Sequence, residues 1–412
     1  MPIDFQTLTT YIFLFISLYL EIFFLVTYVE NRGLIRKEGL TREPQFYPSL
    51  TVIVPCYNEQ DTVARTLMSI LRLDYPREKI KIFVVNDGST DCTASVLKRF
   101  EKNKQIKIFH KENGGKHTAI NFALLHTKSE LVGCLDADSF VATDTLKNIV
   151  IYFENKNVMS VVPSIIVENP ENVIQFIQKV EYNWGVFLRK ILSCMGAIYI
   201  TPGPFSIFRR EIFEKLGNYK HAHHTEDLEF ALRMQKNHYK IVNAHNAHVY
   251  TVAPKTLRSL YVQRLRWTYG FLKNAQDYRS LFFKKEYGDL GLFVLPMATV
   301  TIFTALYGVG SFIFNWSANM FEEITKIQTI GMHIPNFEFD WFFLNTNVSF
   351  LVMVTLSSLT IILLLIGKKL AEGNVAVSKD LIYFLFFYPF IAPLWLTRAV
   401  YNVVASRKIS WR

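Results

Sequence analysis

Two carboxylates stand side by side at the end of a strongly apolar stretch of this chain. Residues 131–135 have the pattern of a buried strand, and Asp136 and Asp138 follow with a single small residue between them. Like charges at this spacing repel one another, and a shared cation relieves the repulsion. Oxygen ligands of this kind favour Mg²⁺ or Mn²⁺, with a substrate diphosphate completing the coordination shell. The pair therefore suggests a metal–diphosphate site, although a lone Asp-x-Asp pair is more often a simple turn.

The elements expected between residues 48 and 160 explain how such a site is assembled. Segments with the pattern of buried strands alternate there with segments whose apolar residues recur at helical spacing. This alternation predicts a parallel sheet with helices on both faces, in which ligands bind beyond the carboxyl ends of the strands. Three strand ends then offer carboxylates to one crevice, which is a stronger signal than any single motif. The three polar clusters are Tyr57-Asn58-Glu59, Asn86-Asp87-Gly88-Ser89 and Asp136-Ala137-Asp138.

A glycine-rich turn within residues 112–124 places Lys116 just before an expected helix. The turn is not a P-loop, because the glycine spacing and the Ser or Thr after the lysine are absent. Lys116 can still meet a phosphate at the start of the helix. A surface lysine in a glycine turn explains the same stretch equally well, so the motif depends on its neighbours for a functional interpretation.

Residues 223–237 have the pattern of a helix that begins with acidic residues. Thr225 is the expected N-cap, and Glu226 and Asp227 in the first turn suit the helix dipole. The helix N-terminus is expected to lower the pKa of Asp227, whereas a general base for a sugar hydroxyl benefits from a raised pKa. Close geometry to the acceptor would have to compensate if Asp227 is the base.

Residues 261–270 have the pattern of an amphipathic helix. Gln263, Arg266 and Trp267 fall at positions i, i+3 and i+4, so they share one face. An Arg beside a Trp can bind a diphosphate and stack against a sugar ring. The same residue types also suit a helix that lies at the membrane surface, and the two interpretations are compatible. The apolar stripe of this helix is Leu257, Leu260, Tyr261, Leu265 and Leu272.

Histidines and cysteines are the remaining candidate metal ligands. Histidines gather at residues 221–224 and 245–248, but no Cys or acid completes a zinc site at the usual spacing. The four cysteines are widely spaced and lack a C-x-x-C arrangement, so reduced, structural thiols are expected. They are Cys56, Cys92, Cys134 and Cys194.

Apolar residues are concentrated at the two ends of the chain. Half of the 412 residues are apolar, and they crowd into the first thirty residues and roughly the last 125. The run at residues 11–29 is long enough to span a hydrocarbon core of ~30 Å, and it lacks the features of a cleaved signal peptide. Three more runs lie at residues 290–314, 342–366 and 381–404, the last containing Pro389 and Pro393. These runs predict a membrane protein with a water-soluble middle domain.

The distribution of charge predicts the orientation of these spans. Residues 30–43 hold four Lys or Arg, whereas residues 315–340 hold one lysine against four acids. The positive-inside rule then puts the middle domain in the cytoplasm and residues 315–340 outside. The net charge is +10, and residues 255–289 alone hold eight Lys or Arg against three acids. Anionic lipid headgroups and a phosphorylated substrate explain this excess better than nucleic acid does.

Taken in order, four stretches of the chain form a known set of motifs. They are NDGS around Asp87, DAD at residues 136–138, TED at residues 225–227 and QRLRW at residues 263–267. With them, the chain resembles the processive family-2 glycosyltransferases, the membrane synthases that make cellulose, chitin, hyaluronan and poly-N-acetylglucosamine. The resemblance covers roughly residues 50–270 and the membrane layout.

This resemblance implies an α/β GT-A fold, a UDP-sugar donor, Mg²⁺ or Mn²⁺, and inversion to a β-linkage. It implies that Asp227 is the general base and that Asp138 ligates the metal. The residues implied for the donor nucleotide are Tyr57, Glu59, Asp87, Lys116, Asp136 and Arg266. Those implied for the acceptor sugar and the diphosphate are Gly203, Glu226, Gln263, Arg264 and Trp267.

Two departures from the family pattern concern the acceptor. The stretch TPGPFSIFRR at residues 201–210 stands where relatives often have a Gly preceded by Ser or Cys. Lys255 stands where many relatives carry Glu, and Pro202 and Pro204 could reshape the acceptor mouth. The identity of the sugar and processivity therefore stay open.

The sequence thus predicts four regions and one main function. Residues 1–30 are expected to form a transmembrane helix, 31–250 a cytoplasmic GT-A domain, 251–289 interfacial helices, and 290–412 about three spans. The expected protein is a multi-pass enzyme of the plasma membrane that extends a polysaccharide from a UDP-sugar, with UDP-N-acetylglucosamine as the favoured donor, and exports it. The alternatives are transfer of a single sugar to a lipid carrier or glycolipid, and an inactive sugar-nucleotide sensor or scaffold.

The expected partners follow from these hypotheses. They are the UDP-sugar donor, a polysaccharide or lipid acceptor, and the bilayer, with no nucleic acid. Because about four spans are few for a polymer conduit, a homo-oligomer or an accessory subunit is a further candidate.

Overall fold

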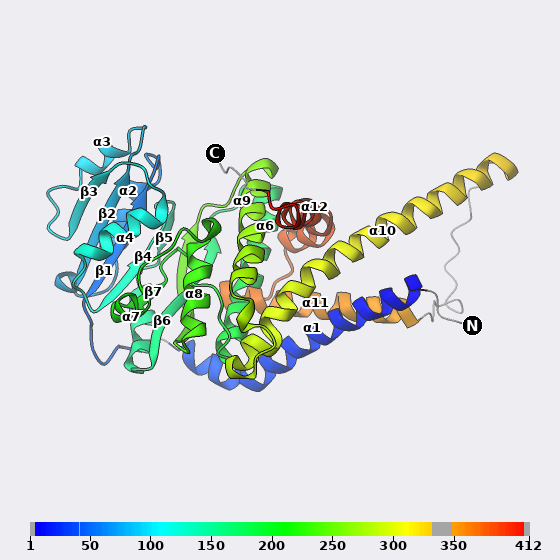
Figure 1. Cartoon of the computed structure of the whole chain (residues 1–412), viewed down its shortest axis with the longest axis horizontal. Coiled ribbons are helices and arrows are strands. Elements are labelled where there is room, and N and C mark those ends of the chain that lie inside the picture. Colours follow the sequence, from blue (N-terminus) through cyan, green and yellow to red (C-terminus); the bar gives the residue numbers. More distant parts are fainter. Residues whose placement is uncertain (1–4, 41, 332–347, 408–412) are drawn as a thin grey trace.

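The computed structural model describes residues 5–40, 42–331 and 348–407. It consists of a sheet-based domain and a group of long apolar helices, with two amphipathic helices between them (Figure 1). The chain starts in one of the long helices, builds the whole sheet, and then returns to the helical group. The domain that carries the strand-end motifs therefore lies between the apolar segments in the sequence.

One eight-stranded sheet forms the centre of the domain, with the strand order β3-β2-β1-β4-β7-β6-β8-β5. The first four strands in this order run parallel to one another: β3 (Ile106–Lys111), β2 (Ile80–Asp87), β1 (Leu50–Cys56) and β4 (Leu131–Cys134). The other four are β7 (Ile207–Arg209), β6 (Val158–Val167), β8 (Lys240–Thr251) and β5 (Ser139–Val141).

The parallel sheet predicted from residues 48–160 is confirmed for β1 to β4, whereas the second half of the sheet is mixed. Strand β7 runs antiparallel to both β4 and β6, and β5 runs antiparallel to β8. Strand β7 comes after a long helical excursion, and its chain joins the sheet from the carboxyl end of β4, where the N–H of Phe205 bonds to the carbonyl of Cys134. The predicted set of parallel strands covers residues 50–134 only, and the sheet is mixed.

Helices cover both faces of the parallel half, which explains its nearly continuous apolar strands. Side chains of β1 alternate between two cores, with Val52 and Val54 in one and Ile53 in the other. The first core packs under α2 (Val63–Leu71), α3 (Thr93–Lys98) and α5 (Thr145–Val150). The second packs under α4 (Lys116–His126), α7 (Glu211–Leu216) and α8 (Glu226–Lys236).

Two amphipathic helices connect this domain to the apolar helices. They are α6 (Val173–Cys194) and α9 (Leu257–Asp277), and they lie between the sheet and the long helices in Figure 1. Helix α6 packs on α11 (Val348–Glu372) and on α12 (Lys379–Val404), and α9 also packs on α12. The remaining long helices are α1 (Phe5–Glu38) and α10 (Leu295–Ile330). Helix α12 therefore supports both amphipathic helices.

Within the described residues, four helices are long and apolar enough to cross a membrane: Thr7–Glu38, Leu290–Thr329, Val348–Glu372 and Lys379–Val404. The predicted boundary at residue 30 falls inside the first of them, because α1 continues to Glu38 without a break. Residues 315–330, expected in a connection between spans, belong to α10, while residues 332–347 lie outside the described residues. Helix α12 is continuous through Pro389 and Pro393.

Candidate active site

Asp87 organises the glycine-rich turn in front of α4. Its carboxylate accepts hydrogen bonds from the backbone N–H groups of Gly114 at 3.1 Å and Gly115 at 2.8 Å. Lys111, the register partner of Asp87 on β3, lies 2.6 Å from the same carboxylate. Gly115 has a φ of 91°, a conformation that favours glycine. These bonds determine where α4 begins, and therefore where its first residue, Lys116, is placed.

Lys116 points from the start of α4 to the Asp136–Asp138 pair. Its Nζ lies 2.5 Å from Asp136 Oδ1, so one member of the acidic pair has a cationic partner. Asp138 accepts a hydrogen bond of 3.1 Å from Ser139 Oγ. Burial, and then the charge of Asp136, raise the pKa of Asp138. The repulsion expected from the sequence is thus present, and it falls mainly on Asp138.

Glu59 adds a third carboxylate to this region. Burial raises its pKa, and the charges of Asp138 and Asp136 act in the same direction. Its side chain accepts a hydrogen bond of 2.6 Å from Thr62 Oγ1, while Tyr57, two residues earlier at the end of β1, is 38% exposed. Two of the three predicted strand ends therefore contribute negative charge to one place, and the third, through Asp87, fastens the turn that carries Lys116.

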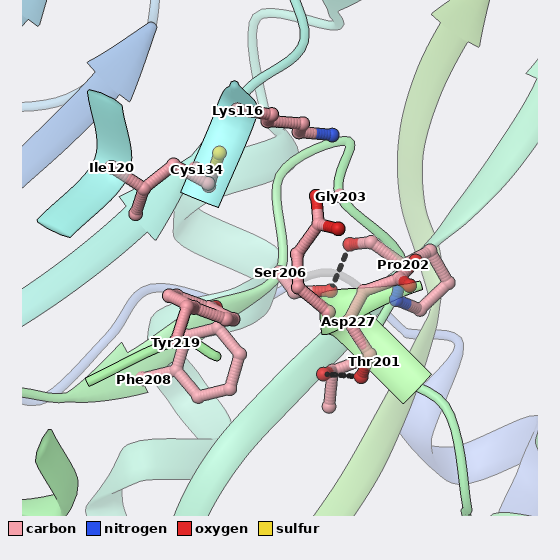
Figure 2. A pocket seen from close by; sticks show the side chains of 11 residues that line it. Lys116, Ile120, Cys134, Thr201, Pro202, Gly203, Ser206, Phe208, Tyr219 and Asp227 are labelled. Atoms are coloured by element: carbon pink, nitrogen blue, oxygen red, sulfur yellow. Dashed lines mark hydrogen bonds between the residues drawn. The ribbon is translucent and has the colours of Figure 1, made fainter. Parts of the chain in front are cut away.

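Lys116 and Gly203 are among the residues that line a small pocket (Figure 2). Gly203 lies against the Lys116–Asp136 ion pair: a Cβ atom on Gly203 would be 2.6 Å from Lys116 Nζ and 3.1 Å from each carboxylate oxygen of Asp136. Glu226 and Asp227, at the start of α8, line the same pocket. The other lining residues are Ile120, Cys134, Thr201, Pro202, Ser206, Phe208 and Tyr219.

The pKa of Asp227 is raised to about 6, so the prediction of a lowered pKa is wrong. Burial in the pocket is the main cause, and the charge of Glu226 adds to it. The carboxylate accepts one hydrogen bond from a helix N–H, that of Leu228 at 2.9 Å, and Lys116 also lowers the pKa. The hydrogen bond from Leu228 and the charge of Lys116 lower the pKa by less than burial raises it, and the sequence does not reveal this burial. A carboxyl group with a pKa near 6 is suited to accept a proton close to neutral pH.

The sequence suggested that the side chain of Thr225 caps α8, but the structure contains no such capping hydrogen bond. Thr225 Oγ1 donates to the carbonyl of Ala222 at 3.1 Å and accepts from Asn274 Nδ2 of α9 at 2.9 Å. On the other side, Thr201 Oγ1 donates to the carbonyl of Asp227 at 2.9 Å. Tertiary contacts with a loop and with α9, rather than a local cap, therefore hold the start of α8.

Arg264, in the QRLRW stretch of α9, is 3% exposed and is engaged inside the protein. Its Nε and Nη2 donate to the carboxylate of Glu181 on α6, at 2.9 and 2.8 Å. Its Nη1 donates to Gln263 Oε1 at 2.5 Å, and the guanidinium lies 4.2 Å from the ring centroid of Trp267. Arg264 thus joins α9 to α6, and its predicted contact with acceptor or diphosphate stays a prediction.

The other predicted residues of α9 are more open. Trp267 is 38% exposed and Arg266 is half-buried, with its charge among the causes that lower the pKa of His224 after burial and His221. Leu257 is 43% exposed, so the apolar stripe expected on this helix begins at Leu260. None of these α9 residues is among those that line the pocket, and α9 contacts the start of α8 through the hydrogen bond from Asn274 to Thr225.

Several residues of the site were not found from the sequence. Lys111 is opposite Asp87 in the parallel register, and the alternation of β3 is a signal that could have indicated it. Thr201, Glu181 and Asn274 act through partners 26, 83 and 49 residues away. No local pattern marks such contacts.

The chain is similar to known proteins. Residues 51–217 match the family model Glycosyl transferase family 2. A poly-beta-1,6-N-acetyl-D-glucosamine synthase of Staphylococcus epidermidis is 28% identical over 303 residues, which cover 71% of this chain and 72% of the relative. A second synthase of that name, from Staphylococcus epidermidis strain RP62A, is 31% identical over 243 residues, 58% of each chain. The chain thus spans little more than half of this second relative.

A solved structure also resembles the fold. The mannosyltransferase of Pyrobaculum calidifontis, in complex with GDP-Man and Mn²⁺, aligns with a TM-score of 0.59 at 19% identity. The alignment covers 96% of this chain and all of the other one. Together with the family match and the sheet described above, this likeness confirms the predicted α/β GT-A fold combined with a helical region.

Proposed function

We propose that this protein, whose residues 51–217 match the family model Glycosyl transferase family 2, elongates a β-linked polysaccharide from a UDP-sugar. The relatives named poly-beta-1,6-N-acetyl-D-glucosamine synthase support N-acetylglucosamine as the transferred sugar and UDP-N-acetylglucosamine as the donor. The acceptor is then the non-reducing end of the growing chain. The four long apolar helices support a protein embedded in the plasma membrane, with the sheet domain in the cytoplasm and the product exported.

The observation that carries this proposal is the position of Asp227. It is a carboxylate with a pKa near 6 in the same pocket as Lys116, and Gly203, which lies against the Lys116–Asp136 pair, lines that pocket too. A donor diphosphate near Lys116 would place its sugar between these groups and Asp227. The basic side chain and the carboxylate then face the leaving group and the acceptor respectively, as a direct displacement requires.

In the proposed reaction, Asp227 accepts the proton of the acceptor hydroxyl as that oxygen attacks the anomeric carbon of the donor sugar. The new bond from carbon to oxygen forms while the bond from the anomeric carbon to the diphosphate breaks. UDP leaves with the bonding electron pair, and configuration at the anomeric carbon inverts. Lys116 sits where it can stabilise the negative charge that builds up on the diphosphate.

The acidic pair fits a divalent cation, and the proposal assigns Mg²⁺ or Mn²⁺ to it. Asp138 would be the protein ligand, since Asp136 has Lys116 as a partner whereas burial and Asp136 leave Asp138 with a raised pKa. Such a carboxylate is stabilised in its charged form by a nearby cation. When bound, the metal neutralises charge on the departing diphosphate. The Mn²⁺ in the complex of the Pyrobaculum mannosyltransferase is consistent with this assignment.

The remaining predicted residues have proposed roles around these groups. Tyr57, Glu59, Asp87 and Arg266 are assigned to the donor side, where Asp87 acts by holding the turn before Lys116. Gly203 and Glu226, which line the pocket, are assigned to the acceptor and diphosphate side. Gln263 and Trp267 of α9 are assigned to the same side. Arg264 is assigned to the same region through its contact with Gln263 and Trp267.

Incubation of the full chain in membranes with Mn²⁺ and a panel of UDP-sugars tests the proposal. We expect UDP release and a product of high molecular mass with UDP-N-acetylglucosamine, and neither with Asp227→Asn. A product that carries one sugar on a lipid would contradict polymer synthesis and favour the lipid-carrier alternative. Absence of UDP release with every sugar nucleotide would leave only the inactive sensor or scaffold.

A further inference from the structure

A second cleft borders α8 and shares no lining residue with the pocket in Figure 2. Its volume is about 600 Å³, within the range of clefts that hold small ligands. Glu229, Arg233 and Lys236 of α8 line it, and the end of α9 forms another wall, so we call it the α8–α9 cleft. Successive residues of a helix are turned by about 100°, so Asp227, in the first pocket, and Glu229 point to nearly opposite sides of α8.

Both acidic side chains of the α8–α9 cleft already have partners. Glu229 accepts hydrogen bonds from Arg233 Nη2 at 2.7 Å and from the hydroxyl of Tyr278 at 2.5 Å. Asp277, near the end of α9, lies 2.9 Å from His223 Nε2. The carboxylates of the cleft are therefore engaged with one arginine, one tyrosine and one histidine.

Two lysines of the cleft have no carboxylate partner. Lys220 precedes the short helix η3 (Ala222–His224), and Lys236 is the last residue of α8. Both are exposed, and neither forms an ion pair with any of the residues that the structure describes. Lys236 Nζ lies 6.0 Å from the ring centroid of Tyr278, which lines the same cleft. Two positive charges without counter-ions at one cleft favour an anionic ligand, and phosphate oxygens are suited to them.

Asn274 and Arg233 add buried polar atoms that lack partners. Asn274 is fully buried, and its Nδ2 donates at 2.9 Å to the carbonyl of Gly270 and to Thr225 Oγ1. Because a carbonyl oxygen only accepts, this contact determines the orientation of the amide and leaves Oδ1 as the free acceptor. Neither Asn274 Oδ1 nor Nε of Arg233, which is 7% exposed, has a hydrogen-bond partner among the described residues. Such atoms are costly, and a ligand in the cleft that they line would relieve them.

We infer that the α8–α9 cleft binds a phosphate ester with free hydroxyl groups, and that this ligand changes the rate of the enzyme. Lys220 and Lys236 bind the phosphate oxygens, and a hydroxyl group of the ligand donates to Asn274 Oδ1. The connection to the reacting groups is short, since Asn274 holds Thr225 and Asp227 is two residues further on. A ligand that contacts Asn274 therefore favours one position of the start of α8 over another. The cleft goes beyond the proposed function, and only the effect on rate rests on it.

Calorimetric titration of the detergent-purified full chain with glucose 6-phosphate tests the site. UDP and Mn²⁺ are present at saturation, so that the proposed donor site is filled. We expect binding of glucose 6-phosphate but not of glucose, and an affinity about tenfold lower in the double variant Lys220→Gln with Lys236→Gln. The matched control is Lys98→Gln with Lys102→Gln, which removes the same charge from exposed lysines outside both clefts and should bind normally. UDP binding by each variant reports that its fold is intact.

A lipid headgroup can supply the same chemistry as a soluble ligand, and nanodiscs distinguish the two sources. Phosphatidylglycerol carries a phosphate ester with free hydroxyl groups, whereas phosphatidylcholine has no free hydroxyl in its headgroup. Glucose 6-phosphate that binds in phosphatidylcholine but is excluded in phosphatidylglycerol would assign the cleft to the lipid headgroup. Equal binding in both kinds of nanodisc would assign it to a soluble phosphate ester.

The effect on rate is measured as UDP release from UDP-N-acetylglucosamine in the same preparations. We expect the phosphate ester to change this rate at least twofold in the unmodified chain and in the control, but not in Lys220→Gln with Lys236→Gln. Three results would overturn the inference: no binding of either phosphate ester, equal binding by the unmodified chain and the double variant, or binding that leaves the rate unaltered. If the unmodified chain releases no UDP from any sugar nucleotide, the proposed function fails, and the binding data still decide on the cleft.

Discussion

The side chain of Thr225 occupies the space that Gly270 leaves open on α9. A Cβ atom on Gly270 would lie 2.3 Å from Thr225 Oγ1 and 2.4 Å from its Cγ2. Thr225 also accepts the hydrogen bond from Asn274, one turn further along α9. Because Asp227 is only two residues beyond Thr225, the helix with the QRLRW stretch positions the carboxylate proposed as the base.

Gly270→Ala is therefore expected to lower kcat. The added methyl group displaces Thr225 and with it Asp227, and a misplacement of about 1 Å can cost ~100-fold in rate. Turnover of UDP-N-acetylglucosamine by membranes measures the effect. The double substitution Gly270→Ala with Thr225→Ala removes the two nearest atoms and should recover part of the loss. Gly308→Ala is the matched control, since a Cβ atom there meets nothing within 4 Å; an equal loss in both variants would refute the coupling.

The activity is expected to fall at acidic pH with the protonation of Asp227. Its pKa is raised to about 6, so the carboxylate is charged at a pH above about 6. As the pH falls through this value, the carboxylate is protonated and can no longer accept a proton. Below about pH 6 the rate should drop roughly tenfold per unit. The initial rate of UDP release at saturating donor measures the profile. A rate that stays level well below pH 6 would argue against Asp227 as the base.

Asp227→Asn is expected to reduce turnover by a factor of about 100 to 10,000, because it removes general-base catalysis. UDP binding should survive, since the substitution leaves the Lys116–Asp136 pair in place. Turnover is measured by UDP release and nucleotide binding by calorimetry. Comparable turnover in the variant would remove Asp227 from the proposed mechanism.

Asp138→Ala is expected to remove the dependence on divalent metal together with the activity. This carboxylate has a raised pKa through burial and Asp136, and it is the proposed ligand of the cation. A Mn²⁺ titration of UDP affinity should be steep in the unmodified chain and flat in the variant. Asp74→Asn, an exposed carboxylate paired with Lys147, serves as the control. Metal dependence that persists in Asp138→Ala would move the metal site elsewhere.

Gly203→Ala is expected to raise KM for the donor several-fold. The new methyl group would stand 2.6 Å from Lys116 Nζ and 3.1 Å from both oxygens of Asp136, so the ion pair must shift. Gly33→Ala, where a Cβ atom meets nothing within 4 Å, is the control. Donor KM unchanged in both variants would show that the ion pair does not contact the donor.

Arg264→Met is expected to cost about 3–5 kcal/mol of stability, because it leaves the Glu181 carboxylate without its buried partner. The combined substitution Arg264→Met with Glu181→Met should cost less than the single change. Thermal unfolding in detergent measures both. Lys255→Met breaks an ion pair to Glu171 whose side chains are 58% and 66% exposed, and a loss of about 0–1 kcal/mol is expected there. Equal losses at the two sites would contradict a bracing role for Arg264.

The local patterns of the sequence determined much of this protein. Residues 131–135 end on Asp136 and Asp138, and the apolar runs near both ends predict the long helices that the structure contains. Helical and strand periodicity, and the polarity of strand ends, depend on neighbours in the chain, so they are legible without a structure. The order of such elements predicted a parallel sheet with helices on both faces, and the resemblance of four short motifs implied the GT-A fold.

Only the tertiary structure decided which groups meet and in which state. The antiparallel β7, the Lys116–Asp136 pair and the Arg264–Glu181 pair join residues far apart in the sequence. The helix position of Asp227 suggested a lowered pKa, but its burial beside Glu226 raises it to about 6. The reason is physical: hydration and electrostatic fields depend on everything that surrounds a group in space, and the sequence lists only what precedes and follows it.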